Sequence, residues 1–472
     1  GNSHEIGGKK LLWPKFNLGF SRSRCTEVVW GGRSTQIQDI FMSLGGSGQL
    51  KQLRMADRLG MLPDHVIERI LKFLPIKDAA KTAMLSRKWS ILWRNIPRLV
   101  FDDSFARITE RGGSKLKAKK ILMDIYKALL LHDGPIAKFV LAIPGLSPCD
   151  EIDHIVHHLA NKGVKKLELL FGEESGDYPS DRRIHSSLFS AVQLSSLILE
   201  GGKIVTPSWF AGFSCLKILQ LYTVTLPPDF FHNFLPACPL LEDLYLWYCA
   251  GASEIELVAP CLKVFLFIGY PVNIMFKCTP ILSEVSILPY GEADVNMGKK
   301  LDMVALFASL PALEQLLVNF QFLKVLAASD HVPVKLPSPL HLRVLGIYRG
   351  HYGGPLETSV IFCLIRSSLR LHRLDLQMKA GERAAFCEPM SIEKECCEED
   401  SEISCLREVY IQNSPGSQPE LELVRFVFET SHQLQKLVIK ASDQLGCEDR
   451  LKFLEEVVRY KRASTQAEVI YS

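Results

Sequence analysis

One spacing of apolar residues recurs along most of the chain. An apolar residue is followed by two more, three and five positions further on, and this pattern returns about every 27 residues. The two later residues point to the same side of a short strand, because successive strand side chains alternate. No such unit buries its apolar side alone, so neighbouring units must stack. The units begin at Ile136, Val164, Leu194, Leu216, Leu241, Leu262, Leu282, Leu313, Leu342, Leu371, Leu406 and Leu434.

Between these strands the spacing of apolar residues is often that of a helix. Residues 152–159 carry one apolar stripe and residues 304–310 a less regular one. The period lies in the range of leucine-rich repeats. However, the intervals run from 20 to 35 residues, and the consensus Asn or Cys at position +8 occurs only as Cys249. We therefore predict an α/β fold, an irregular leucine-rich repeat solenoid (horseshoe) with parallel strands on its concave side. A generic α/β domain is the alternative.

Residues 62–99 have a purely helical spacing. Pro63 suits a helix start because its missing N–H needs no partner there. Asp78 is the expected N-cap of a second helix through Leu85, and Ser86 the expected cap of a third. So few residues with such broad apolar stripes should complete their burial against a partner. The stripes comprise Val66, Ile67, Ile70, Leu71 and Leu74 in the first helix and Trp89, Leu92, Trp93 and Ile96 in the third.

The segment LPDHVIERILKFLPIKDAAKTAMLSRKWSILWRNIPRL resembles the F-box over its whole length. It has the opening Leu-Pro, the Leu-Pro that closes the first helix, the Ser-Arg-x-Trp turn and the closing Leu-Trp. A helical cap on the next domain is the alternative. The resemblance implies a three-helix F-box that binds a Skp-type adaptor, and through it cullin and RING subunits. By position it assigns adaptor contacts to Leu62, Pro63, Ile67, Ile70, Leu71, Leu74 and Pro75, and the F-box core to Trp89, Leu92 and Trp93.

The C-terminal stretch resembles the FBD region of plant F-box proteins. It is predicted to form a strand from Leu406, an amphipathic helix, a strand from Leu434, a helix over 450–461 and a last strand from Glu468. These elements would supply the cap that a solenoid requires. The chain thus resembles a plant F-box/leucine-rich repeat protein. The expected domains are a disordered extension at 1–54 before a natural start at Met55, the F-box at 58–104, the repeats at 105–400, and FBD-like repeats with the cap at 401–472.

Composition narrows the class of protein. The chain has 472 residues, of which 47% are apolar and 23% charged, with a net charge of +3. This balance predicts a folded protein and gives no sign of a nucleic-acid or membrane surface. The thirteen cysteines include no CxxC pair, and Cys215, Cys261 and Cys363 lie in apolar runs, which indicates reduced, buried thiols. With no spanning apolar stretch or signal-peptide core, we expect a location in the nucleus or cytoplasm.

The repeats also suggest where a target protein would bind. Strand residues at positions +2, +4 and +6 of a unit face the concave side, and several are aromatic, as hot-spot residues often are. The alternative is that irregular repeats shift the register and bury them. A convergent cluster of basic residues on that side would favour a pocket for a small-molecule ligand, but they are sparse and dispersed, at Lys166, Arg373, Lys436 and Lys440. The candidate target-binding residues are Tyr222, Tyr245, Trp247, Tyr348 and Tyr410.

Catalytic chemistry finds no support in the sequence. His154, His157 and His158 lack a further ligand, so surface histidines are expected rather than a metal site. Nucleotide-binding and hydrolase motifs are missing, and no cofactor is expected. The resemblance implies a non-catalytic, substrate-recognition subunit of an SCF-type (Skp-cullin-F-box) ubiquitin ligase. The alternatives are an F-box scaffold outside the ligase and a receptor whose repeat pocket needs a small-molecule ligand.

Overall fold

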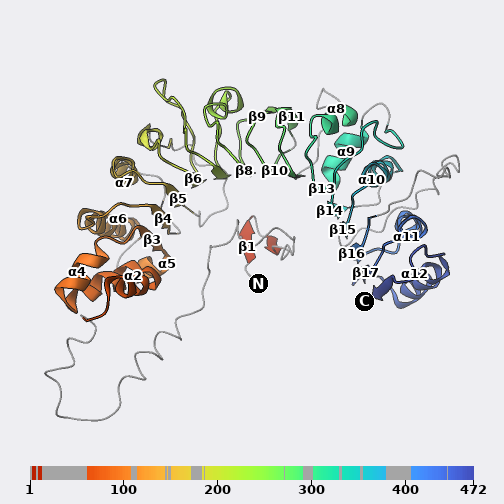
Figure 1. Ribbon diagram of the computed structural model, residues 1–472, viewed down its shortest axis with the longest axis horizontal. Coiled ribbons are helices and arrows are strands. Elements are labelled where there is room, and N and C mark those ends of the chain that lie inside the picture. The colour runs from red at the N-terminus through yellow and green to blue at the C-terminus, as the bar shows by residue number, and fades with distance from the viewer. Residues whose placement is uncertain are drawn as a thin grey trace, which may run out of the picture. The chain divides into compact units, whose positions relative to one another are not determined.

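A computed structural model gives the fold (Figure 1). It describes residues 3–6, 9–12, 61–107, 114–143, 146, 150–171, 183–184, 186–252, 254–270, 272–290, 301–328, 332–350, 355–378, 405–443 and 445–472. The chain forms two compact units. The first comprises Gly1–Ser147 and Phe171–Tyr178, and the second comprises Pro148–Leu170 and Pro179–Ser472.

Within the predicted N-terminal extension the structure describes only two short strands. Strands β1 (Ser3–Ile6) and β2 (Lys9–Leu12) pair antiparallel, with Ser3 opposite Leu12. The rest of 1–54, including the stretch just before Met55, lies outside the described residues. The predicted disorder and the predicted start residue therefore stay predictions.

Three short helices follow, as predicted. They are α2 (Asp64–Phe73), α3 (Ile76–Lys81), which continues into the 3₁₀ turn η2 (Thr82–Met84), and α4 (Arg87–Trp93). Ser86 caps α4, and its Oγ accepts a hydrogen bond from the N–H of Trp89 at 3.4 Å. The predicted N-cap Asp78 is wrong. Pro75 holds that position, and Asp78 lies in the first turn of α3, because a proline with no N–H can start a helix without a side-chain cap.

The first unit also contains two strands of the repeat type. Strand β3 (Arg98–Asp102) leads into α5 (Asp103–Arg107) and α6 (Ser114–Leu130), and then comes β4 (Lys138–Ala142). β3 and β4 pair in parallel, and the buried rings of Phe101 and Phe139 lie 5.5 Å apart between centroids. The repeat pattern thus begins one unit earlier than predicted.

The second unit is built on one parallel sheet, in the order β18-β17-β16-β15-β14-β13-β12-β10-β8-β7-β6-β5. Each of the twelve predicted repeats contains a strand that begins two residues after the predicted start, β4 included, and each starting residue is buried. The apolar spacing was therefore sufficient to place them. The strands of the sheet in the second unit are β5 (Lys166–Leu170), β6 (Ser196–Glu200), β7 (Ile218–Tyr222), β8 (Asp243–Trp247), β10 (Val264–Gly269), β12 (Glu284–Pro289), β13 (Gln315–Asn319), β14 (Val344–Gly350), β15 (Arg373–Met378), β16 (Glu408–Ser414), β17 (Lys436–Ala441) and, after the last predicted repeat, β18 (Glu468–Tyr471).

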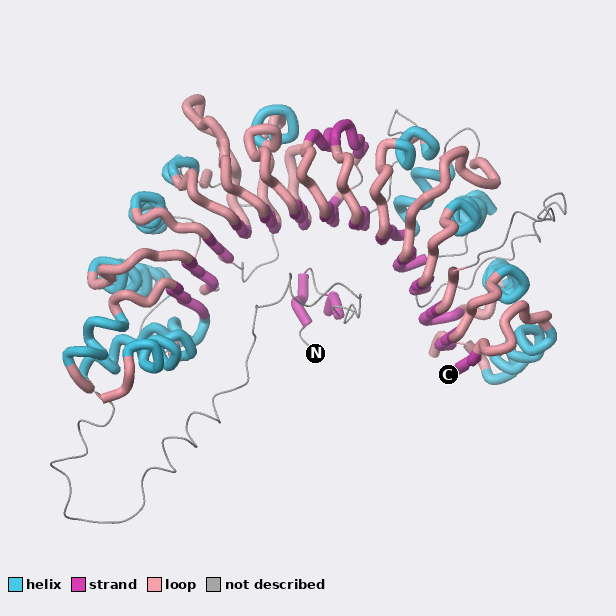
Figure 2. Tube along the Cα trace, viewed as in Figure 1, coloured by secondary structure: helices cyan, strands magenta, loops and turns pink. Residues whose placement is uncertain are grey.

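Helices and loops cover the other face of this sheet, so that within this unit the strands follow the inner side of a curve (Figure 2). The final order β16, α11, β17, α12, β18 is the predicted one. The covering elements are α7 (Asp150–Asn161), η3 (Ser186–Ser190), η4 (Phe230–Phe234), α8 (Met303–Ala308), α9 (Phe320–Ala327), α10 (Pro355–Ser367), α11 (Gln418–Thr430) and α12 (Cys447–Arg459).

In two units the outer layer is formed by strands rather than helices. Between β8, β10 and β12 the outer layer consists of strands β9 (Glu254–Val258) and β11 (Asn273–Cys278), which pair in parallel. Helix-like stretches were expected between the repeat strands, and here two strands take their place. These intervals are among the shortest in the chain, and their apolar residues alternate, as in Ile255 with Leu257 and Ile274 with Phe276, all four buried.

The cysteine prediction is partly wrong. Cys363 is buried, Cys261 is half-buried and Cys215 is exposed, and all three are free thiols. Cys215 comes directly before the buried Leu216 at the turn into β7. An apolar neighbourhood in sequence thus does not decide the burial of a residue at a turn.

Candidate functional site

The start of the first F-box helix is fixed by one lysine of the third helix. Lys88 forms an ion pair with Asp64 at 2.7 Å, and its Nζ also donates to the carbonyl oxygen of Leu62. These contacts hold the Leu62-Pro63 entry against α4. A second lysine, Lys77, ties α3 to α5, donating to the carbonyl of Phe105 at 2.6 Å and lying 4.0 Å from the centre of its ring.

The predicted adaptor residues divide into two groups. Ile67 and Leu71 are buried in the three-helix core together with Trp89, Trp93 and Ile96. Their side chains do not reach the surface, so we assign them to the core. The other five reach the surface: Pro63 and Pro75 are exposed, and Leu62, Ile70 and Leu74 are partly buried against the core. Leu92 is partly buried too, while Trp89 and Trp93 are core residues as predicted.

Several large apolar side chains of the F-box helices are exposed, and we did not predict a role for them. Met84 is 90% exposed, Met61 78%, Phe73 72% and Ile91 62%. They lie at helix ends and turns, or on the side of α4 opposite its tryptophans. Apolar residues outside the core stripe were the signal that could have identified them. Their exposure fits a domain whose burial a partner completes.

The concave face of the second unit carries three rows of side chains. Because the strands are parallel and in register, side chains at position +2 of successive units are neighbours, as are those at +4 and at +6. Residues at +3 and +5, such as Leu219 and Leu221, point the other way into the core. The predicted register is therefore confirmed, and the predicted target-binding residues lie on the concave face.

Two of these aromatic residues, Tyr222 and Trp247, are in contact. The rings of Tyr222 and Trp247 are 5.1 Å apart between centroids and are tilted by 40°. Tyr245 lies on the same strand as Trp247, but only 9% of it is exposed. Tyr222 and Trp247 are half-buried, so part of each remains accessible to a partner, whereas Tyr245 is nearly buried.

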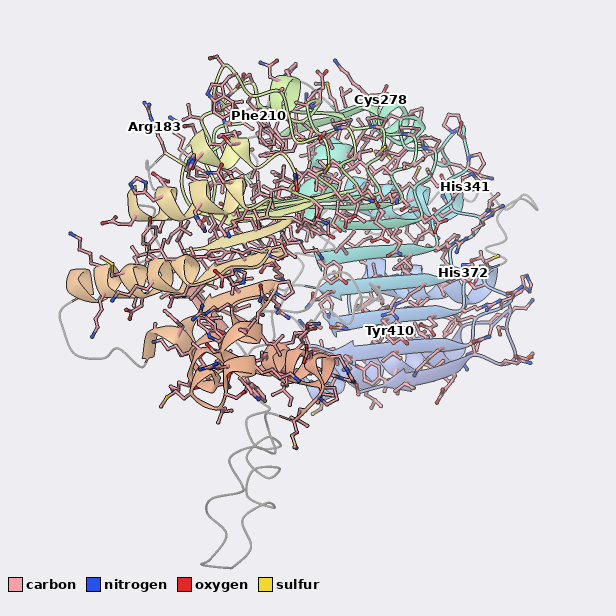
Figure 3. All side chains as sticks on the ribbon, turned by 60° about the vertical axis from the view of Figure 1, so that its left-hand side comes forward. Arg183, Phe210, Cys278, His341, His372 and Tyr410 are labelled. Carbon is pink, nitrogen blue, oxygen red and sulfur yellow. The ribbon has the colours of Figure 1, made fainter. Side chains whose placement is uncertain are left out.

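Tyr348 and Tyr410 belong to a second, polar group. The guanidinium of Arg373 lies 4.6 Å from the ring centre of Tyr410, donates to Asp375 at 2.8 Å and lies 3.6 Å from Glu408. Burial raises the pKa of Asp375 and of Tyr348. Figure 3 shows Tyr410 on the sheet of this part of the unit. The structure thus separates the predicted residues into an aromatic group and a charged group.

Three tyrosines that we had not selected extend the aromatic group. Tyr248, Tyr270 and Tyr290 follow β8, β10 and β12, and their ring centres are 5.0 Å apart for Tyr248–Tyr290 and 4.7 Å apart for Tyr270–Tyr290. They lie just beyond the last concave position. A search of the residues that follow each predicted strand would have found them.

Other kinds of site find little support. Among the residues that the structure describes, no group of three or more His, Cys, Asp or Glu side chains could hold a metal ion, and His154 and His157 are exposed. No helix in the described ranges is both long and apolar enough to cross a membrane.

Comparisons with known proteins agree with the F-box helices and with the leucine-rich repeats described above. Residues 59–101 match the F-box domain model. Residues 152–349 match the model described as "FBD-associated F-box protein At5g56370, LRR repeats". An F-box followed by leucine-rich repeats defines the class of F-box/LRR proteins.

Relatives from Arabidopsis thaliana share this arrangement. The chain is 29% identical to "F-box/FBD/LRR-repeat protein At1g13570", over 88% of this chain and 98% of that one. It is 24% identical to "Putative FBD-associated F-box protein At5g56440", over 87% and 98%. It also aligns with the Leptospira interrogans LRR protein LIC12759, with a TM-score of 0.32, 12% identity and coverage of 81% and 92%. The chain is a plant F-box/LRR protein with an FBD region.

Proposed function

We propose that this protein is the substrate-recognition subunit of an SCF-type ubiquitin ligase. The F-box binds a Skp-type adaptor, through which cullin and RING subunits join, and the concave face of the repeats binds the target protein. The protein itself performs no chemistry. It raises the local concentration of the target at the ubiquitin-transfer machinery, which converts a bimolecular encounter into a local one.

The observation that supports adaptor binding most is the apolar surface of the F-box helices. Met61, Phe73, Met84 and Ile91 are each more than half exposed in a domain of three short helices. Exposed apolar surface of this kind marks a protein interface. Family membership supports the same role, because the F-box is the adaptor-binding module of such ligases.

Adaptor binding is tested with Leu62→Ala combined with Pro63→Ala. Leu62 is only partly buried and Pro63 is exposed, so the helices should persist while adaptor pull-down is lost. The matched control is Leu451→Ala with Val458→Ala, two exposed apolar residues of α12, which should leave the pull-down unchanged. Undiminished adaptor capture by the first variant would contradict the proposed contacts.

Ligase assembly needs a separate experiment, because an F-box protein can also act as an adaptor-bound scaffold. Cullin and RING subunits should co-purify with the chain through the adaptor, and a reconstituted complex should ubiquitylate a captured target. Adaptor binding without cullin would favour the scaffold. We also propose a location in the nucleus or cytoplasm, which imaging of a tagged chain would test.

A further inference from the structure

The last concave position of five neighbouring strands forms a continuous row. The in-register partners are Glu200, Tyr222, Trp247, Ile268 and Leu288, on β6, β7, β8, β10 and β12. We call these five residues the carboxyl row. All five are half-buried. By contrast, several residues in the two rows behind it are buried, among them Tyr245, Asp243 and Ser286. The carboxyl row is therefore the one concave row of these five strands in which every side chain is partly exposed.

The three edge tyrosines widen the row on its outer side. Tyr270 is 47% exposed, and its ring packs against Tyr290, which in turn packs against Tyr248. Together with Tyr222 and Trp247 they give five aromatic rings on four neighbouring strands. Tyr and Trp at such density are typical of binding hot spots, because they offer large rigid area at low entropic cost.

The backbone beside the row is strained. The residues directly after Glu200, Tyr222 and Trp247 all have a left-handed φ: 75° at Gly201, 51° at Thr223 and 54° at Tyr248. Glycine takes this conformation freely, but a β-branched residue such as Thr rarely does. Thr223 and Tyr248 therefore adopt this backbone conformation at a cost, and strain of this kind gathers at functional sites.

The charge of this part of the face is negative. At the +2, +4 and +6 positions of the described strands β5 to β14, the acidic residues are Glu168, Glu200, Asp243 and Glu284, and the one basic residue is Lys166. Glu200 forms the β6 end of the carboxyl row, next to Tyr222. Aromatic rings attract cations at their faces, so a basic side chain at this end would meet both a carboxylate and a ring.

The spacing of the row suits one backbone conformation. Neighbouring strands lie about 4.8 Å apart, so every second strand lies about 9.6 Å away. A polyproline II helix advances about 9.3 Å per turn of three residues. A peptide in this form that crosses the strands would therefore place every third side chain over alternate strands, as on Tyr222 and Ile268 or on Trp247 and Leu288.

We propose that the carboxyl row binds an extended, polyproline II segment of the target, with proline or another apolar residue at every third position and an Arg or Lys at the Glu200 end. This inference rests on the proposed function, since it specifies the motif by which the target is recognised.

The test uses the full chain purified with a Skp-type adaptor and measures fluorescence anisotropy of a labelled synthetic peptide. The peptide has about twelve residues, proline at every third position and Arg at each end, so that its direction does not matter. One comparison peptide has Glu in place of Arg, and another has the same composition in scrambled order. The Arg peptide should bind at least roughly tenfold more tightly than either.

Two variants and one control locate the binding. Trp247→Ala should weaken Arg-peptide binding at least roughly tenfold, and Glu200→Lys should reverse the preference in favour of the Glu peptide. Trp209→Ala removes an exposed tryptophan outside the sheet. It should change neither the affinity for the Arg peptide nor the preference for that peptide over the Glu peptide. Circular dichroism and continued binding of the adaptor establish that each variant is folded. If Trp247→Ala does not fold, the reversed peptide preference of Glu200→Lys tests the proposal by itself.

Absence of binding, equal binding of the Arg, Glu and scrambled peptides, or an equal loss in Trp209→Ala overturns the proposal. These failures are distinct from failure of the proposed function. A chain that retains the adaptor and binds none of the peptides refutes only the motif, whereas a chain that binds the Arg peptide and lacks the adaptor refutes only the ligase role.

Discussion

The F-box helices and the concave face of the repeats present apolar residues in opposite ways. In the F-box, Ile67 and Leu71 fill the core, while Phe73 and Met84 at helix ends are exposed. On repeat strands such as β7, burial alternates residue by residue, and every side chain of the carboxyl row is partly exposed. A small helical domain exposes part of its apolar surface, because its core is too small to bury all of it. On the repeat sheet, the concave face is partly exposed because no second layer of the described residues covers it.

The comparison predicts that the F-box is the more fragile region. Trp89 is buried among three short helices, and Trp89→Ala should cost roughly 3–5 kcal/mol there, as aromatic-to-Ala changes in cores do. Hydrogen exchange should show loss of protection over α2 to α4 and intact strands β5 to β18. Uniform destabilisation of the whole chain would instead indicate that the two regions unfold together.

Within the repeats, two adjacent residues of β7 should behave very differently. Leu221 is buried and Tyr222 is half-buried on the opposite face. Leu221→Ala should therefore cost roughly 2–5 kcal/mol in thermal or urea unfolding, and Tyr222→Ala much less. Similar losses for both would mean that Tyr222 acts as a core residue rather than as binding surface.

The C-terminal end of the repeats should respond to pH. Glu420, in α11, is buried, and burial raises its pKa to about 7, even though hydrogen bonds such as that from the N–H of Gly416 at 3.1 Å lower it. The folded state therefore keeps a proton that the unfolded chain releases near its ordinary value of 4.5. The stabilising contribution of Glu420 is fully present below that value and falls as pH rises towards 7, by up to roughly 3 kcal/mol.

Glu420→Gln should remove this fall, because the amide oxygen still accepts the Gly416 bond but carries no charge. Urea unfolding of both chains from pH 4 to pH 8 measures the difference. A constant difference across this range would contradict the shifted titration of Glu420.

The smallest expected effect concerns the strained backbone beside the row. Thr223→Gly should stabilise the fold by about 1 kcal/mol, since glycine adopts its φ of 51° without steric cost. Peptide binding should be retained, because the rings of Tyr222 and Trp247 are untouched. A loss of stability would show that Thr223 makes packing contacts that outweigh its strain.

Sequence patterns predicted the repeat strands well and the outer layer less well. The apolar spacing placed all twelve strands, because each unit carries its own apolar residues at positions 0, +3 and +5, even though stacked neighbours are needed to bury them. The predicted start of the second F-box helix was a few residues late, because Pro75 rather than Asp78 is its N-cap. The outer strands β9 and β11 were missed, since an expectation of helices ignored the alternation in two short intervals.

The candidate sites divide in the same way. Sequence identified the aromatic residues Tyr222 and Trp247 and their shared face, but not the depth of Tyr245 or the edge tyrosines Tyr248 and Tyr290. Exposure on a sheet depends on the side chains of neighbouring strands, which come from residues about a repeat away in the chain. Likewise, the F-box pattern did not separate the buried Ile67 and Leu71 from the surface residues around them.

What the sequence determined by itself was the order of elements, the repeat and the F-box, because each depends on local spacing of apolar residues and on turn residues such as Pro63 and Ser86. What only the tertiary structure decided was which of those residues remain at the surface. That depends on stacking: Glu200, Tyr222, Trp247, Ile268 and Leu288 are far apart in sequence, and they become one row only when parallel strands pair in register.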